Sequence, residues 1–417
     1  MKNAFRFLLA LAALGFSPAS ANPGGLDGAT GNIFKFDEEK KTFELLKETE
    51  YDPKTETARS RFTVQWTDET EVEKITPKAN FSGLGTQLQV VFDKIDKKNA
   101  AAYHEGKPFM AGEATIFTGR DFPPKWKDNI LRIHCIFTPD PGDTSTSGTF
   151  EFKGKRVKVS VRPKVGTISH REMTSPAALA KGFWQATIRG DEKDGIFTAT
   201  YMVITQLEDP LATDDPKLPR VLIIGDSISM NYFDAAKAEL KGIANLHRNE
   251  GNAGPSTRGV LNAELWLGNY KEKGRHWDVI QFNHGLHDLK QVYDKKTDTF
   301  GAYAVPMEDY KANLEKEIAI LKKTGAKLIW CSTTPVPNDN KSQYARRKGA
   351  CVDFNKAAME VMAKYPEIQI NDLHATVTNS PVFDNWRKTI DVHFYKEEET
   401  RELGKAVATA IRAALPE

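Results

Sequence analysis

The segment Arg220-Val221-Leu222-Ile223-Ile224-Gly225-Asp226-Ser227-Ile228-Ser229 decides the fold of the second half of the chain. Its first part is a short apolar run rich in β-branched residues, which predicts a buried strand. The run stops at Gly225-Asp226-Ser227, and a helical pattern follows over 231–240. Glycine permits a sharp bend, and the next helix directs its unpaired N–H groups to the same place. Ser227 is therefore either a helix cap or a nucleophile at the carboxyl end of a strand.

The rest of the second half alternates between strand and helix patterns. Further strands are predicted at 245–248, 277–284, 327–331 and 368–371. Helices are predicted at 310–321, 344–364 and 403–415. This alternation predicts an α/β fold whose parallel sheet is covered by helices on both faces. In such folds the functional site lies beyond the carboxyl ends of the strands.

The first half, about 22–213, has the pattern of a β-rich domain. Apolar and polar residues alternate in several segments, as they do at Trp184, Ala186 and Ile188. A turn at 190–195 leads to a second alternating segment at 197–203, which predicts a β-hairpin. Short strands between clusters of Gly, Pro and Asp predict a sandwich-like domain. An acidic, proline-containing connector places the domain boundary near residue 213, so the predicted domains are 22–213 and 214–417.

Residues 1–21 have the three parts of a secretory signal peptide. Lys2 and Arg6 come first, a Leu/Ala-rich stretch follows, and Ala19-Ser20-Ala21 ends the segment. We expect cleavage before Asn22 and a periplasmic or secreted protein, with an uncleaved anchor as the alternative. No later apolar run is long enough to cross a bilayer, so stable membrane insertion is not expected.

The composition is that of a globular protein, with 40% hydrophobic and 27% charged residues. A formal net charge of +2 gives no reason to expect nucleic acid or an anionic membrane as a partner. Cys331 and Cys351 are either a disulfide pair or two buried thiols. The sequence leaves the oligomeric state open.

Polar residues gather at the predicted carboxyl ends of the strands. In chain order they are Asp226, Ser227, Asn252, Gly254, Ser256, Arg258, Asn283, His284, His287, Asp288, Thr333 and Thr334, with Asp391 and His393 before the last helix. Acyl transfer needs a nucleophile, a base, a group that orients the base, and donors for an oxyanion. Each role has a candidate here. A metal site at His284, His287 and Asp288 is the competing interpretation.

The second half resembles the SGNH, or GDSL-type, hydrolases, a family of esterases and acetylesterases. Ile224-Gly225-Asp226-Ser227 matches the first block of the family, and Asn252-Ala253-Gly254 matches the second. Gly285-Leu286-His287-Asp288 stands where the family usually has Gly-x-Asn-Asp. Asp391-Val392-His393 is one residue shorter than the usual Asp-x-x-His. The resemblance begins near Arg220 and implies a flavodoxin-like, three-layer α/β/α hydrolase domain.

The resemblance also implies a catalytic triad. Ser227 would be the nucleophile, His393 the general base, and Asp391 the residue that orients His393. Because the spacing between Asp391 and His393 is shortened, Asp384 is an alternative orienting residue.

The same resemblance implies an oxyanion hole. The backbone N–H groups of Ser227 and Gly254 would contribute to it, and His287 would supply the third donor in place of asparagine. Asn283 is the alternative third donor. Arg258, together with Asn252 and Asn283, is a candidate for substrate binding. No metal or other cofactor is expected.

These residues together predict an exported serine esterase that acts on O-acyl esters, with O-acetyl groups on carbohydrate favoured. The expected partner is thus a small-molecule or glycan ester. The alternatives are a lipid or aryl esterase or a thioesterase of the same fold, or a carbohydrate-binding protein without turnover.

Overall fold

The computed structural model describes residues 29–52, 57–78, 80–81, 87–118, 133–142, 145–162, 167–180, 182–194, 196–342 and 344–416. The predicted signal peptide, residues 1–21, lies outside these ranges. The described residues form two compact units, the first made of 29–47 and 61–207 and the second of 48–60 and 208–416.

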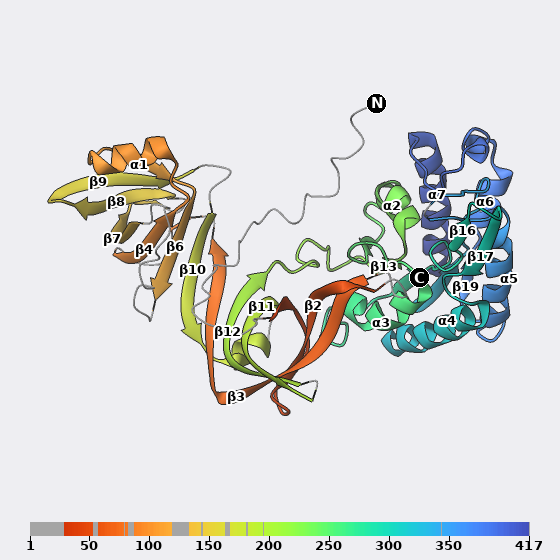
Figure 1. Cartoon of the computed structure of the whole chain (residues 1–417), viewed down its shortest axis with the longest axis horizontal. Coiled ribbons are helices and arrows are strands. Elements are labelled where there is room, and N and C mark those ends of the chain that lie inside the picture. The colour runs from red at the N-terminus through yellow and green to blue at the C-terminus, as the bar shows by residue number, and fades with distance from the viewer. Residues whose placement is uncertain are drawn as a thin grey trace. The chain divides into compact units, whose positions relative to one another are not determined.

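Strands dominate the described residues up to 207, of which 48–52 and 57–60 are grouped with the second unit (Figure 1). They are β1 (Ala29–Asp37), β2 (Thr42–Asp52), β3 (Thr57–Lys78), β4 (Leu88–Asp93), β5 (Phe109–Ala111), β6 (Glu113–Thr118), β7 (Ile133–Pro139), β8 (Ser147–Phe152), β9 (Lys155–Val161), β10 (Thr167–Thr174), β11 (Phe183–Lys193) and β12 (Ile196–Leu207). Two short helical segments accompany them, α1 (Lys97–His104) and η1 (Pro176–Ala180).

These strands form one continuous sheet in the order β12-β11-β1-β2-β3-β10-β6-β4-β7-β8-β9-β5. Because β12 also pairs with β3, the first five strands of this order close into a ring around a core that includes Leu45, Val64 and Trp66. The sequence predicts a sandwich, and the structure differs, since the strands are hydrogen-bonded in a single sheet. The hairpin predicted at 184–203 is confirmed by the antiparallel pairing of β11 with β12.

The second unit is built on a five-stranded parallel sheet. Its strands are β13 (Arg220–Ile224), β14 (Asn245–Arg248), β15 (Val279–Phe282), β18 (Lys327–Cys331) and β19 (Gln369–Asn371). Its helices are α2 (Ser227–Glu239), α3 (Ser256–Leu267), α4 (Met307–Leu321), α5 (Ala350–Met362), α6 (Leu373–Asn379) and α7 (Glu397–Ala414), with short η2 (Lys322–Thr324), η3 (Pro381–Phe383) and η4 (Trp386–Lys388). The strand order β14-β13-β15-β18-β19 is the order of a doubly wound sheet.

The central strands of this sheet are buried on both faces, as a parallel sheet between helices requires. All four residues of β15 are buried, and so are the last four of β13. The helices form two packed groups, α2 with α7 and α3 with α4, while α5 packs against α4. The unit is therefore an α/β structure with its core between sheet and helices.

Parallel pairing places the carboxyl ends of β13 and β15 side by side. Ile224 is in register with Phe282, and the N–H of Asn283 donates to the carbonyl of Ile224 at 3.0 Å. The loops that follow these two strands therefore start next to each other. One of them contains a hairpin that the sequence did not predict, made of β16 (Gln291–Asp294) and β17 (Thr299–Tyr303).

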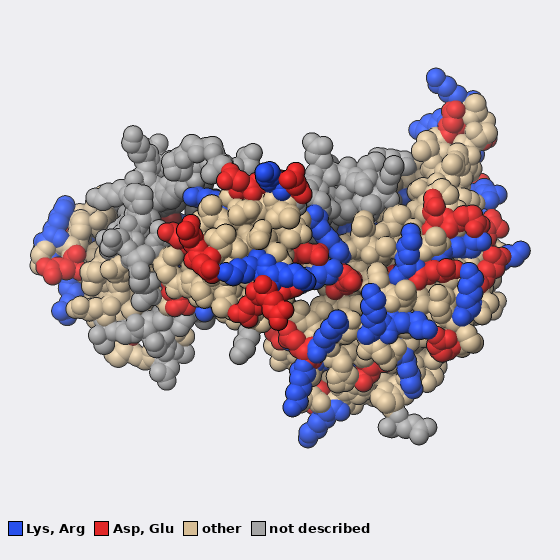
Figure 2. All heavy atoms as spheres, turned by 90° about the horizontal axis from the view of Figure 1, so that it is seen from below, with Lys and Arg blue, Asp and Glu red and all other residues tan. Residues whose placement is uncertain are grey.

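Acidic and basic side chains are interspersed over the face shown in Figure 2, as the small net charge leads one to expect. Among the described residues, no helix has both the length and the apolar character needed to cross a bilayer.

Candidate active site

The turn after β13 is shaped around Gly225. The N–H of Gly225 donates to Asn249 Oδ1 at 2.9 Å, and a Cβ at this position would come within 2.8 Å of a side chain of α2. Asp226 caps α2, because its Oδ1 accepts a hydrogen bond from the N–H of Ile228 at 2.9 Å. The cap is thus Asp226 and not Ser227, which is the first residue of the helix.

Ser227, His393 and Asp391 lie together as a hydrogen-bonded chain. His393 Nε2 is 2.9 Å from Ser227 Oγ, and His393 Nδ1 is 2.7 Å from Asp391 Oδ1. When Nδ1–H donates to the carboxylate, Nε2 is left as an acceptor for the proton of the serine hydroxyl. Ser227 and His393 are 166 positions apart in the sequence, and the fold brings their side chains into contact. The arrangement can activate a serine as a nucleophile.

The shortened spacing between Asp391 and His393 is accommodated by a tight loop. Asp391 Oδ1 also accepts the backbone N–H of His393 at 3.0 Å, and the Tyr395 hydroxyl donates to Asp391 Oδ2 at 3.1 Å. Burial pushes the pKa of Asp391 upward, but the hydrogen bonds from His393 and Tyr395 outweigh it and lower the pKa. Asp384, the alternative orienting residue, instead pairs with Arg387.

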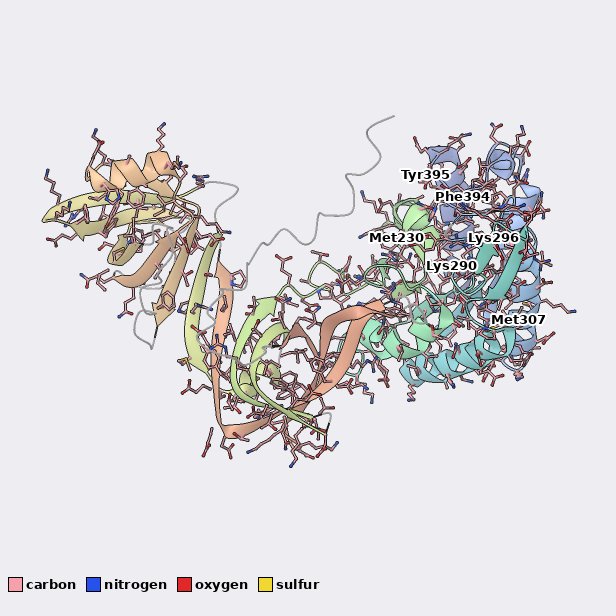
Figure 3. All side chains as sticks on the ribbon, viewed as in Figure 1. Met230, Lys290, Lys296, Met307, Phe394 and Tyr395 are labelled. Carbon is pink, nitrogen blue, oxygen red and sulfur yellow. The ribbon has the colours of Figure 1, made fainter. Side chains whose placement is uncertain are left out.

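The loop that carries His393 is fastened to the helix that carries Ser227. The Trp386 indole N–H donates to the carbonyl of His393 at 3.0 Å, and its ring stacks on Phe394 at a centroid distance of 4.7 Å. The N–H of Phe394 donates to Asn231 Oδ1, in α2, at 3.2 Å. Figure 3 labels Phe394 and Tyr395 together with Met230 of the same helix. Base and nucleophile are therefore held by a common set of contacts.

The second predicted oxyanion donor, Gly254, differs from expectation in one respect. Its N–H donates to Asn252 Oδ1 at 2.8 Å. An oxyanion could therefore accept this N–H only after the Asn252 side chain moves away. Gly254 has a φ of +64°, a conformation in which glycine carries no penalty. A Cβ at Gly254 would lie 3.1 Å from Arg258 Cδ, which places the stem of Arg258 against this loop.

The two candidates for the third donor have different surroundings. Asn283 Nδ2 donates to the carbonyl of Cys331 at 2.6 Å and lies 3.4 Å from Thr333 Oγ1, so its amide ties the ends of β15 and β18 together. His287 is half-buried, and its Nδ1 lies 3.1 Å from Lys290 Nζ.

A scan against protein-family models and a comparison with curated proteins find no match. Solved structures do match. Several of them are named as GDSL-type proteins or acetylesterases. An acetyl xylan esterase is 16% identical over 46% of this chain and 99% of its own, with a TM-score of 0.36. A GDSL-like lipase from Bacteroides thetaiotaomicron is 17% identical over 49% of this chain and 93% of its own, with a TM-score of 0.34.

A third match is the C-terminal catalytic domain of peptidoglycan O-acetyltransferase A from Streptococcus pneumoniae. It is 18% identical over 47% of this chain and 94% of its own, with a TM-score of 0.32. The matches thus span about half of this chain. At these identities they concern the fold, and the chemistry of the site rests on its own geometry.

A buried polar cluster lies beneath the Gly254 loop, and the sequence analysis missed one of its members, Glu317. His284 is fully buried, with Nδ1 2.9 Å from the carbonyl of Gly254 and Nε2 3.2 Å from the carboxylate of Glu317 in α4. Burial lowers the pKa of His284, but the charge and hydrogen bond of Glu317, with Asp288, outweigh it and raise the pKa to about 9. An imidazolium therefore supports the loop.

Asp288 extends this cluster to the start of α3. Its Oδ1 accepts from the N–H of Ser256 at 2.9 Å and from Ser256 Oγ at 2.5 Å. Burial raises the pKa of Asp288 to about 6, while the charge of His284 and the bonds from Ser256 act in the opposite direction. Glu317 was not considered as a site residue in the sequence analysis, because it lies within a helix and not at the end of a strand. The acidic residue on the inner face of that helix was the one available signal.

The metal interpretation of His284, His287 and Asp288 has no geometric counterpart, because the described residues contain no group of three or more His, Cys, Asp or Glu placed to hold a metal ion. Cys331 and Cys351 are buried free thiols.

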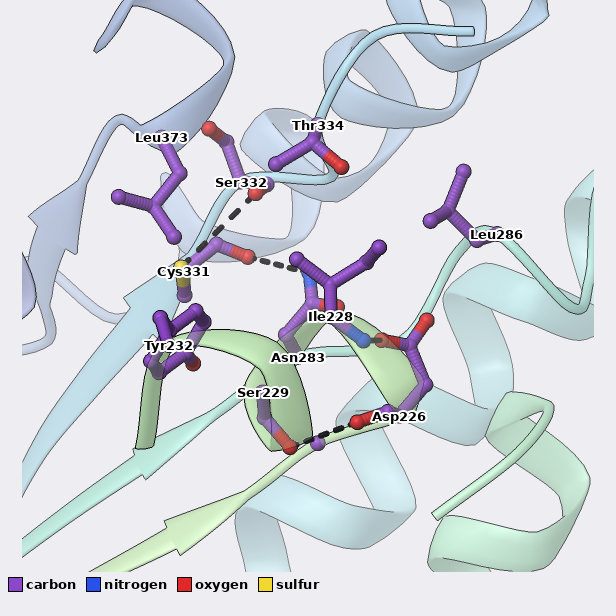
Figure 4. Close-up of a pocket in the computed structure, with 11 residues that line it drawn as sticks. Asp226, Ile228, Ser229, Tyr232, Asn283, Leu286, Cys331, Ser332, Thr334 and Leu373 are labelled. Carbon is purple, nitrogen blue, oxygen red and sulfur yellow. Dashed lines mark hydrogen bonds between the residues drawn. The ribbon is translucent and has the colours of Figure 1, made fainter. Parts of the chain in front are cut away.

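A small cavity lies directly behind the nucleophile turn (Figure 4). Asp226 and Ile228, which flank Ser227, line it together with Leu286 and Thr334. The cavity volume is about 10 Å³, roughly what one water molecule needs. Oδ2 of Asp226 and Oγ1 of Thr334 are buried there without a hydrogen-bond partner among the described residues.

Proposed function

We propose that this protein is a serine esterase that hydrolyses O-acyl esters through an acyl-enzyme, with no cofactor. The observation that carries the proposal is the chain of contacts from Ser227 Oγ to His393 Nε2 at 2.9 Å and from His393 Nδ1 to Asp391 at 2.7 Å. This is the geometry that general-base activation of a serine requires.

The proposed reaction has two halves. Ser227 Oγ bonds to the ester carbonyl carbon while its proton passes to His393 Nε2, and the negative charge develops on the carbonyl oxygen. The carbon–oxygen bond to the alcohol then breaks, and His393 returns the proton to the departing alkoxide. Water attacks the acyl-enzyme in the same manner, releases the acid and restores Ser227.

We favour acetyl as the acyl group and carbohydrate as its carrier. The resemblance of the Gly-Asp-Ser and Asp-x-His motifs to those of esterases and acetylesterases supports acetyl as the acyl group. The predicted signal peptide supports export to a compartment where glycans are abundant. A mature N-terminus other than Asn22 in exported protein would contradict this cleavage site.

The experiment uses 4-nitrophenyl acetate with wild type and two serine variants of the same turn. Ser227→Ala should abolish turnover, since no nucleophile remains. Ser229→Ala should keep it within several-fold, because Ser229 Oγ donates to the Asp226 carbonyl at 2.7 Å. Turnover that survives in Ser227→Ala would refute the proposal, and so would an inactive wild type that is properly folded.

A second assay addresses the acyl group. The rates on 4-nitrophenyl acetate and 4-nitrophenyl decanoate are compared, and acetate should be strongly preferred. Equal rates would refute acetyl specificity while leaving the esterase mechanism intact. Release of acetate from acetylated xylan or acetylated peptidoglycan, tested side by side, would identify the carrier, and release from neither would count against a carbohydrate substrate.

A further inference from the structure

His284 lies just after β15, and both nitrogens of its ring face hydrogen-bond acceptors. Its backbone is fixed, because its carbonyl accepts from the Tyr310 hydroxyl at 3.0 Å and from Thr333 Oγ1 at 3.1 Å. Ring Nδ1 lies 2.9 Å from the Gly254 carbonyl, which can only accept, so Nδ1 carries a proton. Ring Nε2 lies 3.2 Å from the Glu317 carboxylate and donates to it. The ring therefore connects α4 to the Gly254 loop.

The ring of His284 and the carboxylate of Glu317 are tightly enclosed. Both side chains are fully buried. Helix α3 lies against them so closely that a Cβ at Gly259 would be 2.5 Å from His284 Nε2 and 2.9 Å from Glu317 Oε2. Because α3 and α4 enclose the pair, the imidazole presents its Nδ1–H to the Gly254 carbonyl in one orientation.

The Gly254 loop is in turn bonded to the turn that carries the nucleophile. The N–H of Ala253, the residue before Gly254, donates to the carbonyl of Gly225 at 3.1 Å. Ala253 is fully buried, so this hydrogen bond is shielded from water. Gly225 comes two residues before Ser227. A chain of hydrogen bonds and short backbone segments thus runs from α4 through the imidazole to the nucleophile turn.

We propose that His284, held by Glu317, is a positioning residue that fixes the turn of Ser227 through the Gly254 loop. This inference rests on the proposed esterase function. Without the imidazole donor the Gly254 peptide could rotate, and the N–H before it would leave the nucleophile turn. The serine would then shift relative to its base. A displacement of about 1 Å at a reacting group can cost roughly 10² in rate, so the effect falls on kcat.

The kinetic test compares two double variants that differ only in the donor to the Gly254 carbonyl. Both carry Glu317→Leu, because a buried carboxylate left without its partner would be strongly destabilising. One carries His284→Asn and the other His284→Leu. Asparagine and leucine have nearly the same shape, but only the asparagine amide can donate a hydrogen bond. Its Nδ2 stands as far along the side chain as Nδ1 of histidine does.

Thermal unfolding establishes that both double variants are folded before kinetics on 4-nitrophenyl acetate. The variant with His284→Leu should lose about 10- to 100-fold in kcat with KM little changed. The variant with His284→Asn should stay within several-fold of wild type. Equal kcat values in the two folded variants would overturn the proposal. A wild type without turnover would instead refute the esterase function, so the two failures are distinguishable.

Hydrogen exchange tests the same connection without substrate. In wild type the Ala253 amide should be protected, because it donates to the Gly225 carbonyl. It should exchange roughly tenfold faster or more in the variant with His284→Leu and near the wild-type rate in the variant with His284→Asn. Equal protection in the two variants would overturn the proposal. So would an unprotected Ala253 amide in wild type, an outcome that depends on no variant.

Discussion

Asp391 Oδ1 accepts two hydrogen bonds from one residue, the ring N–H and the backbone N–H of His393. We predict that Asp391→Asn lowers kcat by about 10²–10⁴, because an amide that donates to Nδ1 would favour the wrong tautomer of His393. Steady-state kinetics on 4-nitrophenyl acetate measure the loss. Asp384→Asn is the control and should stay near wild type, since Asp384 pairs with Arg387. If Asp384→Asn lowered kcat more than Asp391→Asn does, Asp384 and not Asp391 would be the residue that orients His393.

Single residues show both the reach and the limit of sequence reasoning at this site. The resemblance carried by the motifs at Gly225-Asp226-Ser227 and Asp391-Val392-His393 selected Ser227, His393 and Asp391, which the structure brings into contact. The partner of Gly254 N–H was not predictable, because an Asx contact with Asn252 depends on loop dihedrals that no spacing encodes. The Glu317–His284 contact joins a helix interior to a loop, and no local pattern reports it.

Among the elements, α4 is joined to the loop after β15 by a buried ion pair. The pKa of His284 is raised to about 9 in the folded protein, against about 6.5 for a histidine exposed to water. A raised folded pKa means that the pair stabilises fully below about pH 6.5 and that this stability is lost as pH rises through about 9. At 1.36 kcal/mol per pKa unit the loss is about 3 kcal/mol. Urea unfolding of wild type at about pH 6 and about pH 10 measures it.

Glu317→Gln should flatten this pH dependence, because its carboxylate is the main group that raises the pKa of His284. It should also destabilise the protein at neutral pH by about 3–5 kcal/mol, since a buried charge loses its partner. Glu315→Gln, on the same helix and paired with Lys364 at the surface, should keep the wild-type slope. An unchanged slope in Glu317→Gln would refute the assignment. Asp288, whose pKa is raised to about 6, contributes in the same direction at lower pH.

The contact between α2 and α7 depends on a glycine. A Cβ at Gly404 would lie 2.6 Å from Ala235 Cβ and 2.8 Å from the backbone nitrogen of Ala236. Alanine is the better helix former, yet we predict that Gly404→Ala lowers the free energy of unfolding by about 1–3 kcal/mol through overpacking. Because α2 begins at Ser227 and α7 follows His393, kcat should fall as well. Thermal unfolding and kinetics test both effects.

Lys405→Ala is the matched control, since it raises helix propensity at the next, exposed position of α7 and should not destabilise the protein. A stabilised Gly404→Ala variant would contradict the close packing of the two helices.

In the second unit, the periodicity of apolar residues predicted which segments are strands or helices more accurately than it predicted where each one begins and ends. Helix α5 begins at Ala350 and not near 344, because Arg346 forms a bridge with Asn340 and Gly349 has a φ of +83° before the first turn. The ring of strands in the first unit was missed because alternation reports one buried face and says nothing of which strands pair. The parallel contact of β3 with β12 joins residues more than a hundred positions apart.

At the scale of the whole molecule, the described residues form three apolar cores, two in the first unit and one in the second, and none of them combines residues of both units. Phe43, Leu45 and Val64 belong to the core of the strand ring, whereas Leu314 and Ile318 belong to the core of the second unit. Because each unit has its own core, we predict two unfolding transitions in calorimetry. A covalent serine-directed inhibitor bound at Ser227 should raise the midpoint of one transition and leave the other in place.

Two alanine variants assign the transitions. Leu45 and Leu314 are both fully buried, so either substitution should cost about 2–5 kcal/mol. Leu45→Ala should lower the transition that the inhibitor does not move and should leave kcat on 4-nitrophenyl acetate intact. Leu314→Ala should lower the inhibitor-sensitive transition. One cooperative transition that both variants and the inhibitor shift together would mean that the two cores do not unfold independently, and the catalytic unit could not then be treated as separate from the strand ring.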